Sequence, residues 1–186
     1  MIEVRFHGRG GQGAVIASRL LAEAAFIEGK DVQAFPFFGV ERRGAPVTAF
    51  TKMDNRPIRV KSEVYEPDYV IVLDTALLEY IDVAQGLKED GRLIINAPVS
   101  MADGYRERLG VPCDVVDGTR IAIEHGLGSR EAPIVNTSMV GAFARASGLV
   151  GIESVAEAVR RHVRRKVDAN IAAARDAYEK VDVQEV

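Results

Sequence analysis

Four glycines lie close together near the start of the chain, in the stretch Phe6–Val15 (FHGRGGQGAV). They fit the pattern G-x-G-x-x-G, with an apolar strand before it and a long helix after it. Glycines allow the backbone to turn tightly and approach a ligand, and the amides at a helix start point toward an anion. The stretch therefore predicts a phosphate-binding loop, with these candidate contacts: Gly8, Arg9, Gly10, Gly11, Gln12 and Gly13.

Neighbouring residues disfavour two specific versions of this loop. A Walker A loop needs Lys and then Ser or Thr where Ala14 and Val15 stand, so nucleotide hydrolysis is not expected. A dinucleotide site needs an acidic residue at the end of the second strand, but that strand ends Ala34–Pro36, and Asp31 lies at its start. Two alternatives remain open. Either the loop holds an anion, with the Arg9 guanidinium as a bidentate partner, or the glycines only let the helix pack closely on the strand.

A second charged segment, Phe35–Pro46 (FPFFGVERRGAP), leaves the second predicted strand at its carboxyl end. Open α/β sheets bind ligands at that edge, and the glycine loop is expected at the same edge. Arg42 and Arg43 are therefore predicted to reach the same anion as Arg9, with Glu41 orienting one arginine. The aromatic side chains of this segment either cover an apolar part of a ligand, contact a partner chain, or fold into the core: Phe35, Phe37 and Phe38.

The hydrophobic pattern places both segments in an α/β domain that spans residues 1–186. The sequence predicts a three-layer sandwich, with a mixed, mostly parallel sheet between helices. The predicted single strands are residues 2–6, Asp31–Phe35, Tyr69–Leu73, Arg92–Ile95 and Cys113–Val116, and the first two are expected to run parallel in a βαβ unit. A short turn predicts that Pro46–Lys52 and Pro57–Ser62 form an antiparallel hairpin.

The remaining periodic segments predict helices. The first helix is Ala14–Glu28, which ends at Gly29, and the second is Thr75–Gln85. A third helix is capped by Asn136, Thr137 or Ser138 and runs to Ala146. One long or two short helices follow over Val155–Ile171, with Arg164–Lys166 on a solvated face or at a junction. Asp74 and Asn96 follow strands at the ligand edge, where each either contacts a ligand or caps a helix, and the cap is favoured. His7 is expected to be a hydrogen-bonded structural histidine, and Cys113 a small buried hydrophobic residue.

Composition excludes several classes of protein. The net charge of −3 argues against a nucleic-acid binder. A single cysteine rules out an internal disulfide and a cluster or structural zinc site held by this chain's cysteines alone. The sequence has no apolar run long enough to span a bilayer and no secretion signal, so we expect a cytoplasmic protein without membrane contact. No residues have the spacing of a catalytic triad or a metal site.

The two segments together resemble the gamma subunit of 2-oxoacid:ferredoxin oxidoreductases, of which pyruvate:ferredoxin oxidoreductase is the best-known member. The motifs that carry the resemblance are HGRGGQGA at 7–14, AFPFFGVERRGAPVTAF at 34–50 and VYEPDYVIVLD at 64–74. The first two motifs, taken together in this order and at this spacing, are far more specific than either alone. The resemblance covers most of the chain and weakens after about Val150.

The resemblance implies a complex that decarboxylates a 2-oxoacid, with pyruvate favoured, on thiamine diphosphate. The complex passes two electrons through [4Fe-4S] clusters to ferredoxin and makes an acyl-CoA. Thiamine diphosphate and the clusters are expected on partner subunits of alpha, beta and delta type, which fits the single cysteine and the absence of a recognisable thiamine motif. The chain would have no catalytic residue and no activity alone. Its glycine loop and arginines would contact coenzyme A or organise a subunit interface. The alternatives are a stand-alone NAD- or FAD-binding oxidoreductase and a structural scaffold.

Overall fold

The structure is a computed structural model that describes residues 1–37 and 44–185. It contains a six-stranded sheet in the order β2-β3-β1-β4-β5-β6. The strands are β1 (Ile2–Arg9), β2 (Asp31–Phe37), β3 (Pro46–Asp54), β4 (Tyr69–Val72), β5 (Arg92–Asn96) and β6 (Cys113–Val116). The pairs β1–β4, β4–β5 and β5–β6 are parallel, whereas β3 is antiparallel to both β1 and β2. This confirms the predicted mixed, mostly parallel sheet.

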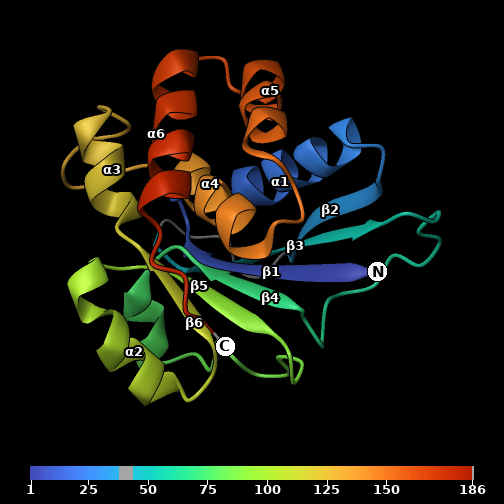
Figure 1. The fold of residues 1–186 in the computed structure, drawn as a ribbon, viewed down its shortest axis with the longest axis horizontal. Helices are drawn as coiled ribbons and strands as arrows, with labels where there is room; N and C mark the ends of the chain where they lie inside the picture. Colours follow the sequence, from blue (N-terminus) through green and yellow to red (C-terminus); the bar gives the residue numbers. More distant parts are fainter. Residues whose placement is uncertain (38–43, 186) are drawn as a thin grey trace.

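Helices cover both faces of the sheet and make three layers (Figure 1). The larger helical layer holds α1 (Ala14–Ile27), α4 (Asn136–Ser147), α5 (Ile152–His162) and α6 (Val167–Lys180). The opposite face is covered by α2 (Ala102–Leu109) and by the residues that follow the short 3₁₀ helix η1 (Thr75–Glu79). A second 3₁₀ turn, η2 (Val99–Met101), leads into α2 and is exposed. Helix α3 (Gly118–Glu124) follows β6 and packs with α4 and α6 on the larger layer.

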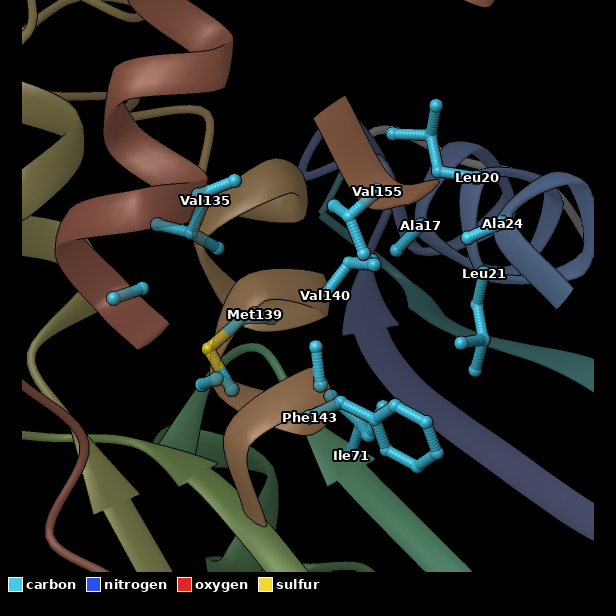
Figure 2. Packing of buried hydrophobic residues seen from close by; sticks show 14 of the residues in the cluster. Ala17, Leu20, Leu21, Ala24, Ile71, Val135, Met139, Val140, Phe143 and Val155 are labelled. Carbon is cyan, nitrogen blue, oxygen red and sulfur yellow. The ribbon is translucent and has the colours of Figure 1, made fainter. Parts of the chain in front are cut away.

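Two apolar clusters hold these layers together, one on each side of the sheet. Alternate residues of β4 and β5 supply both, since Ile71 and Ile94 pack in one cluster while Val70 and Val72 pack in the other. In the larger cluster, Figure 2 shows α4 side chains, including Val140 and Phe143, between the sheet and helices α1 and α5. The uniformly apolar stretch at β4 is therefore a central strand buried on both faces, as predicted.

The predicted hairpin is wrong. Strand β3 pairs with β1 along one edge and with β2 along the other, so neither edge remains for a hairpin partner. Residues 57–64 form no strand. They are held beside β2 through side chains instead, since Ile58 N donates to Asp31 Oδ2 at 2.5 Å and Gln33 Nε2 donates to Ile58 O at 3.0 Å. Strands β1 and β2 do run in the same direction, but β3 lies between them.

The helix predictions are mostly confirmed. The C-terminal region contains two helices, α5 and α6, with Arg164–Lys166 at their junction, and Gly148 ends α4 in a left-handed conformation. The start of α4 differs from the prediction, because its N-cap residue is Val135 and no side chain caps it. The helix predicted over Thr75–Gln85 stops at Glu79. No helix among the described residues is both long and apolar enough to cross a membrane.

Candidate functional site

The glycine loop connects the carboxyl end of β1 to the start of α1. Gly11 and Gly13 have φ values of 100° and 85°, a left-handed conformation that other residues adopt only at a cost. A Cβ on Gly13 would lie 2.6 Å from Asn136 Nδ2, and a Cβ on Gly8 would lie 3.2 Å from the Cβ of Ala14. Close packing therefore accounts for both glycines without a ligand. At Gly8 the neighbour is the first residue of α1, as the packing alternative expects, whereas at Gly13 it is Asn136, the first residue of α4.

The last residues of the second charged segment, Gly44 and Ala45, return to the glycine loop. Gly10 N donates to Ala45 O at 2.9 Å, and Gly44 N donates to Gly10 O at 3.3 Å. The two motifs that carry the family resemblance therefore meet at one point in the fold. Residues 38–43 lie outside the described residues, so the predicted roles of Phe38, Glu41, Arg42 and Arg43 stay predictions.

Arg9 is the arginine of the loop, and its charge is already paired. Its Nε lies 3.1 Å from Asp74 Oδ2, and its Nη2 donates to the Tyr80 hydroxyl at 3.1 Å. The Arg9 side chain remains 34% exposed. An anion that approached the loop would therefore meet a guanidinium that it has to share with the carboxylate of Asp74.

Gln12 ties the loop to the same carboxylate. Its Nε2 donates to Asp74 Oδ2 at 2.8 Å, while its Oε1 accepts from the backbone N of Arg9 at 2.7 Å. The amides of Arg9, Gly10 and Gln12 are therefore engaged within the protein. What the loop still offers an anion is the start of α1, whose first turn has no acidic side chain.

Asp74 and Asn96 act as connectors at the carboxyl edge of the sheet. Asp74 Oδ1 accepts from Ala76 N at 2.9 Å, which confirms the predicted helix cap at η1. Asn96 Nδ2 donates to Leu73 O at 2.9 Å, and Asn96 Oδ1 accepts from Thr119 N at 3.0 Å. Asn96 thus joins the ends of β4 and β5 to the start of α3.

A cleft of about 250 Å³ opens at this edge. After β1 the chain crosses to one face of the sheet, and after the neighbouring strand β4 it crosses to the other face. Open α/β sheets form ligand-binding crevices at such points, where the connections of two adjacent strands diverge. Two of its lining residues, Asp74 and Glu131, are acidic, so a phosphate is better accommodated at the α1 start than inside the cleft. The other lining residues are Gln12, Leu73, Thr75, Asn96, Thr119, Pro133 and Val135.

The aromatic residues of the second segment separate into different roles. Phe35 packs against Phe50 of β3, with ring centroids 5.4 Å apart. Phe37, at the end of β2, is 48% exposed. Phe35 is therefore a packing residue, while Phe37 is free to contact a ligand or another chain.

His7 and Cys113 are buried, as expected, but His7 lacks one expected partner. No described residue forms a hydrogen bond with His7 Nε2. Burial, together with the nearby charge of Arg5, lowers the pKa of His7 to about 4, so the imidazole is neutral at pH 7. Burial raises the pKa of the Cys113 thiol to about 12. Within residues 1–37 and 44–185, no three acidic, histidine or cysteine side chains gather in a way that could hold a metal ion.

Four residues of this edge were not predicted as site residues: Tyr80, Thr119, Glu131 and Asn136, of which only Asn136 was considered, as a helix cap. Thr119 follows β6 by only three residues, so its place near the carboxyl edge has a local signal. The other three come from loops or helix starts whose position depends on long-range packing, and the sequence gives no local signal for them.

Comparison with known proteins gives a consistent result. Residues 3–180 match the family model described as pyruvate ferredoxin/flavodoxin oxidoreductase. Over the full length of both chains, the protein is 56% identical to the pyruvate/ketoisovalerate oxidoreductases common subunit gamma of Pyrococcus furiosus. It is 53% identical to pyruvate synthase subunit PorC of Methanocaldococcus jannaschii, covering 96% of each chain.

A solved structure agrees with these sequence matches. The crystal structure of pyruvate oxidoreductase subunit PORC from Thermotoga maritima superposes with a TM-score of 0.83 and 39% identity, covering 99% of this chain and 98% of that one. The resemblance predicted from the glycine loop and the ERRGAP segment is thus confirmed over nearly the whole chain. The chain belongs to the pyruvate ferredoxin/flavodoxin oxidoreductase family, as a gamma-type subunit.

Proposed function

We propose that the chain is the gamma subunit of a complex that oxidatively decarboxylates a 2-oxoacid, with pyruvate favoured, to an acyl-CoA. In this reaction carbon dioxide is released, the acyl group is transferred to the thiol of coenzyme A, and two electrons pass to ferredoxin. The observation that carries the proposal is the match of the chain, over residues 3–180, to a family of such oxidoreductases. The names of its relatives in Pyrococcus and Methanocaldococcus, which refer to pyruvate, support the substrate class.

The redox and thiamine chemistry belongs, in this proposal, to partner subunits of alpha, beta and delta type. A [4Fe-4S] cluster takes four cysteine thiolates, and the chain has one cysteine. Cys113 is fully buried and its pKa is raised to about 12, so it is not suited to ligate iron at neutral pH. These features agree with clusters and thiamine diphosphate bound elsewhere in the complex.

The contribution of this chain is to help bind coenzyme A and to help assemble the complex. Coenzyme A carries phosphates, and the start of α1 together with the exposed third of Arg9 offers an anion a helix dipole and a guanidinium. Arg9 and Gln12 both contact Asp74 Oδ2, so interactions within the chain hold the glycine loop in place. The candidate contacts remain Gly8, Arg9, Gly10, Gly11, Gln12 and Gly13, with Glu41, Arg42 and Arg43 from the second segment.

The direct test is a reconstituted complex that contains the Arg9→Ala variant. We expect KM for coenzyme A to rise about tenfold with little change in KM for pyruvate, the loss expected when one charge-assisted hydrogen bond to an anion is removed. Arg56→Ala is the matched control, because Arg56 is exposed and follows β3 at the opposite edge of the sheet. An unchanged KM for coenzyme A in the Arg9 variant would support a scaffold role for the loop.

A second test, of whether the catalytic activity belongs to the partner subunits, uses the isolated chain. The isolated chain is expected to reduce neither ferredoxin nor a dye with pyruvate and coenzyme A. Calorimetry with NAD, FAD and coenzyme A separates the proposal from a stand-alone nucleotide-dependent oxidoreductase. Tight binding of NAD or FAD by the isolated chain would contradict the proposal.

A further inference from the structure

The turn between α5 and α6 carries three consecutive cations, Arg164, Arg165 and Lys166, all exposed. No carboxylate of the described residues lies within 4.0 Å of their charged groups. Neighbouring arginines on the same two helices behave differently, since Arg161 pairs with Glu157 and Glu23, and Arg175 pairs with Glu153. In a chain of net charge −3, this turn is a local concentration of unpaired positive charge.

The turn has a fixed shape. Lys166 has φ 52° and ψ 43° and is the only residue other than glycine with positive φ among those described, a conformation that costs about 1–2 kcal/mol. The buried Asn170 holds it, because Asn170 Nδ2 donates to Lys166 O at 2.9 Å and Asn170 Oδ1 accepts from Thr137 Oγ1 at 3.1 Å. Lys166 Nζ also donates to the carbonyl of Gly126. Hydrogen bonds from Asn170 and Lys166 therefore hold the turn that carries the three cations.

A hollow of about 460 Å³ lies beside this turn. Leu127 and Ile134 give it an apolar floor, and Ile134 is 39% exposed although it is a large aliphatic side chain. Arg165 and Lys166 form its cationic rim, and Gly128 and Asn170 complete the lining. We name the hollow and its rim the basic hollow. In Figure 1, the α5–α6 turn lies at the end of these helices farthest from the sheet.

We propose that the basic hollow docks an acidic segment of a partner subunit, with one apolar side chain of that segment seated on Ile134. Charge complementarity selects the occupant, because three adjacent cations match carboxylates spread along a chain, and an apolar floor matches an anchoring side chain. The inference rests on the proposed function, in that the chain works as a subunit of a larger complex. It assigns an interface that is separate from the glycine loop.

A labelling experiment tests the proposal on the assembled complex. The variant Ile134→Cys introduces a thiol on the floor of the basic hollow, and the native thiol of Cys113 gives little background because it is buried and its pKa is about 12. We expect maleimide to label the introduced thiol about tenfold more slowly in the complex than in the isolated chain, because interface cores exclude solvent. Val60→Cys is the matched control, since Val60 is 68% exposed and remote in sequence from the hollow.

A charge-reversal variant supplies the second measurement. Arg165→Glu combined with Lys166→Glu is expected to lower the fraction of chain that enters the complex about tenfold at low salt, and Arg56→Glu to leave it unchanged. Equal labelling rates in the free chain and in an active complex would overturn the docking proposal and leave the proposed function intact. So would protection of the isolated chain by inorganic phosphate alone to the same degree, since that would identify a small-anion site. Failure of the complex to oxidise any 2-oxoacid would instead overturn the proposed function.

Discussion

The Arg9 guanidinium and the Asp74 carboxylate form an ion pair across the carboxyl ends of the adjacent parallel strands β1 and β4. Asp74 Oδ2 also accepts from Gln12 Nε2, so one carboxylate oxygen receives two side-chain donors from the glycine loop. The other oxygen caps η1. Asp74 therefore fixes the loop, sets the charge that an incoming anion meets, and begins the segment that crosses to the opposite face of the sheet.

Asp74→Asn is expected to loosen the glycine loop. The amide nitrogen of Asn has to face either Arg9 and Gln12, which both donate, or the Ala76 amide, so at least one donor loses its acceptor. For a partly exposed group we expect a loss of about 1 kcal/mol in the free energy of unfolding. Urea unfolding of the isolated chain measures this loss. Asp82→Asn is the control, because Asp82 makes a similar turn contact with Ala84 N away from the loop.

Gly13→Ala is expected to destabilise the chain more than Gly29→Ala. Both glycines have φ near 85°, so both substitutions force alanine into a left-handed conformation at a cost of about 1–2 kcal/mol. Only the Cβ at position 13 meets a neighbour, at 2.6 Å from Asn136 Nδ2, whereas the Cβ at position 29 meets open space. Urea unfolding of the two variants separates backbone strain from steric clash. Equal losses would show that Asn136 moves aside at no cost.

The strands that were predicted correctly have local signals. Residues 2–6 alternate apolar and polar side chains, and Tyr69–Leu73 is uniformly apolar, so each pattern identifies its strand without reference to the rest of the chain. The position of β3 has no such signal. A short turn after Pro46–Lys52 favoured a hairpin, but the pairing with β1 is set by sheet formation between residues far apart in sequence. Helix α2 was missed because only one of its residues, Ala102, is buried.

For the candidate site, the sequence predicted where residues lie at the ends of strands but not how they contact one another. The sequence placed Arg9, Asp74 and Asn96 at the carboxyl edge because each of them lies at or directly after the end of a strand, and the structure brings all three there. It did not predict that Arg9 and Asp74 would neutralise each other, because this depends on β1 and β4 being neighbours. The packing of Asn136 on Gly13 likewise depends on how α4 crosses α1.

Asp114→Ala is expected to cost about 3–5 kcal/mol in the free energy of unfolding, because it leaves the mostly buried charge of Arg92 without its partner. Asp114 is completely buried and accepts from Arg92 Nη2 at 2.5 Å and from Gln184 N at 2.9 Å, so it also holds the C-terminal residues against β6. The hydrogen bond that Arg92 makes with Asp114 raises the pKa of the Arg92 guanidinium. The matched control is Asp103→Ala, which removes a fully exposed partner of Arg106. Thermal unfolding of both variants makes the comparison, and a similar small shift in Tm would contradict the buried-pair explanation.

His7 is a source of pH-dependent stability, and the sign follows from its surroundings. Burial lowers its pKa in the folded protein to about 4, against a value of about 6.5 in the unfolded chain. Between these values the unfolded chain binds the proton more readily, so acid favours unfolding. The stability that His7 contributes is fully present above pH 6.5 and is lost as the pH falls through 4.

His7→Leu is therefore expected to flatten the pH dependence of stability. Between pH 7 and pH 5, the parent chain should lose about 2 kcal/mol in the free energy of unfolding through His7, and the variant should lose much less. The carboxyl groups whose pKa values are lowered by ion pairs, such as Glu23 and Asp176, titrate below this window and contribute little within it. Because Nε2 has no partner among the described residues, leucine should cost little at pH 7. Urea unfolding at both pH values measures the difference, and equal slopes for the two chains would show that another group carries the acid sensitivity.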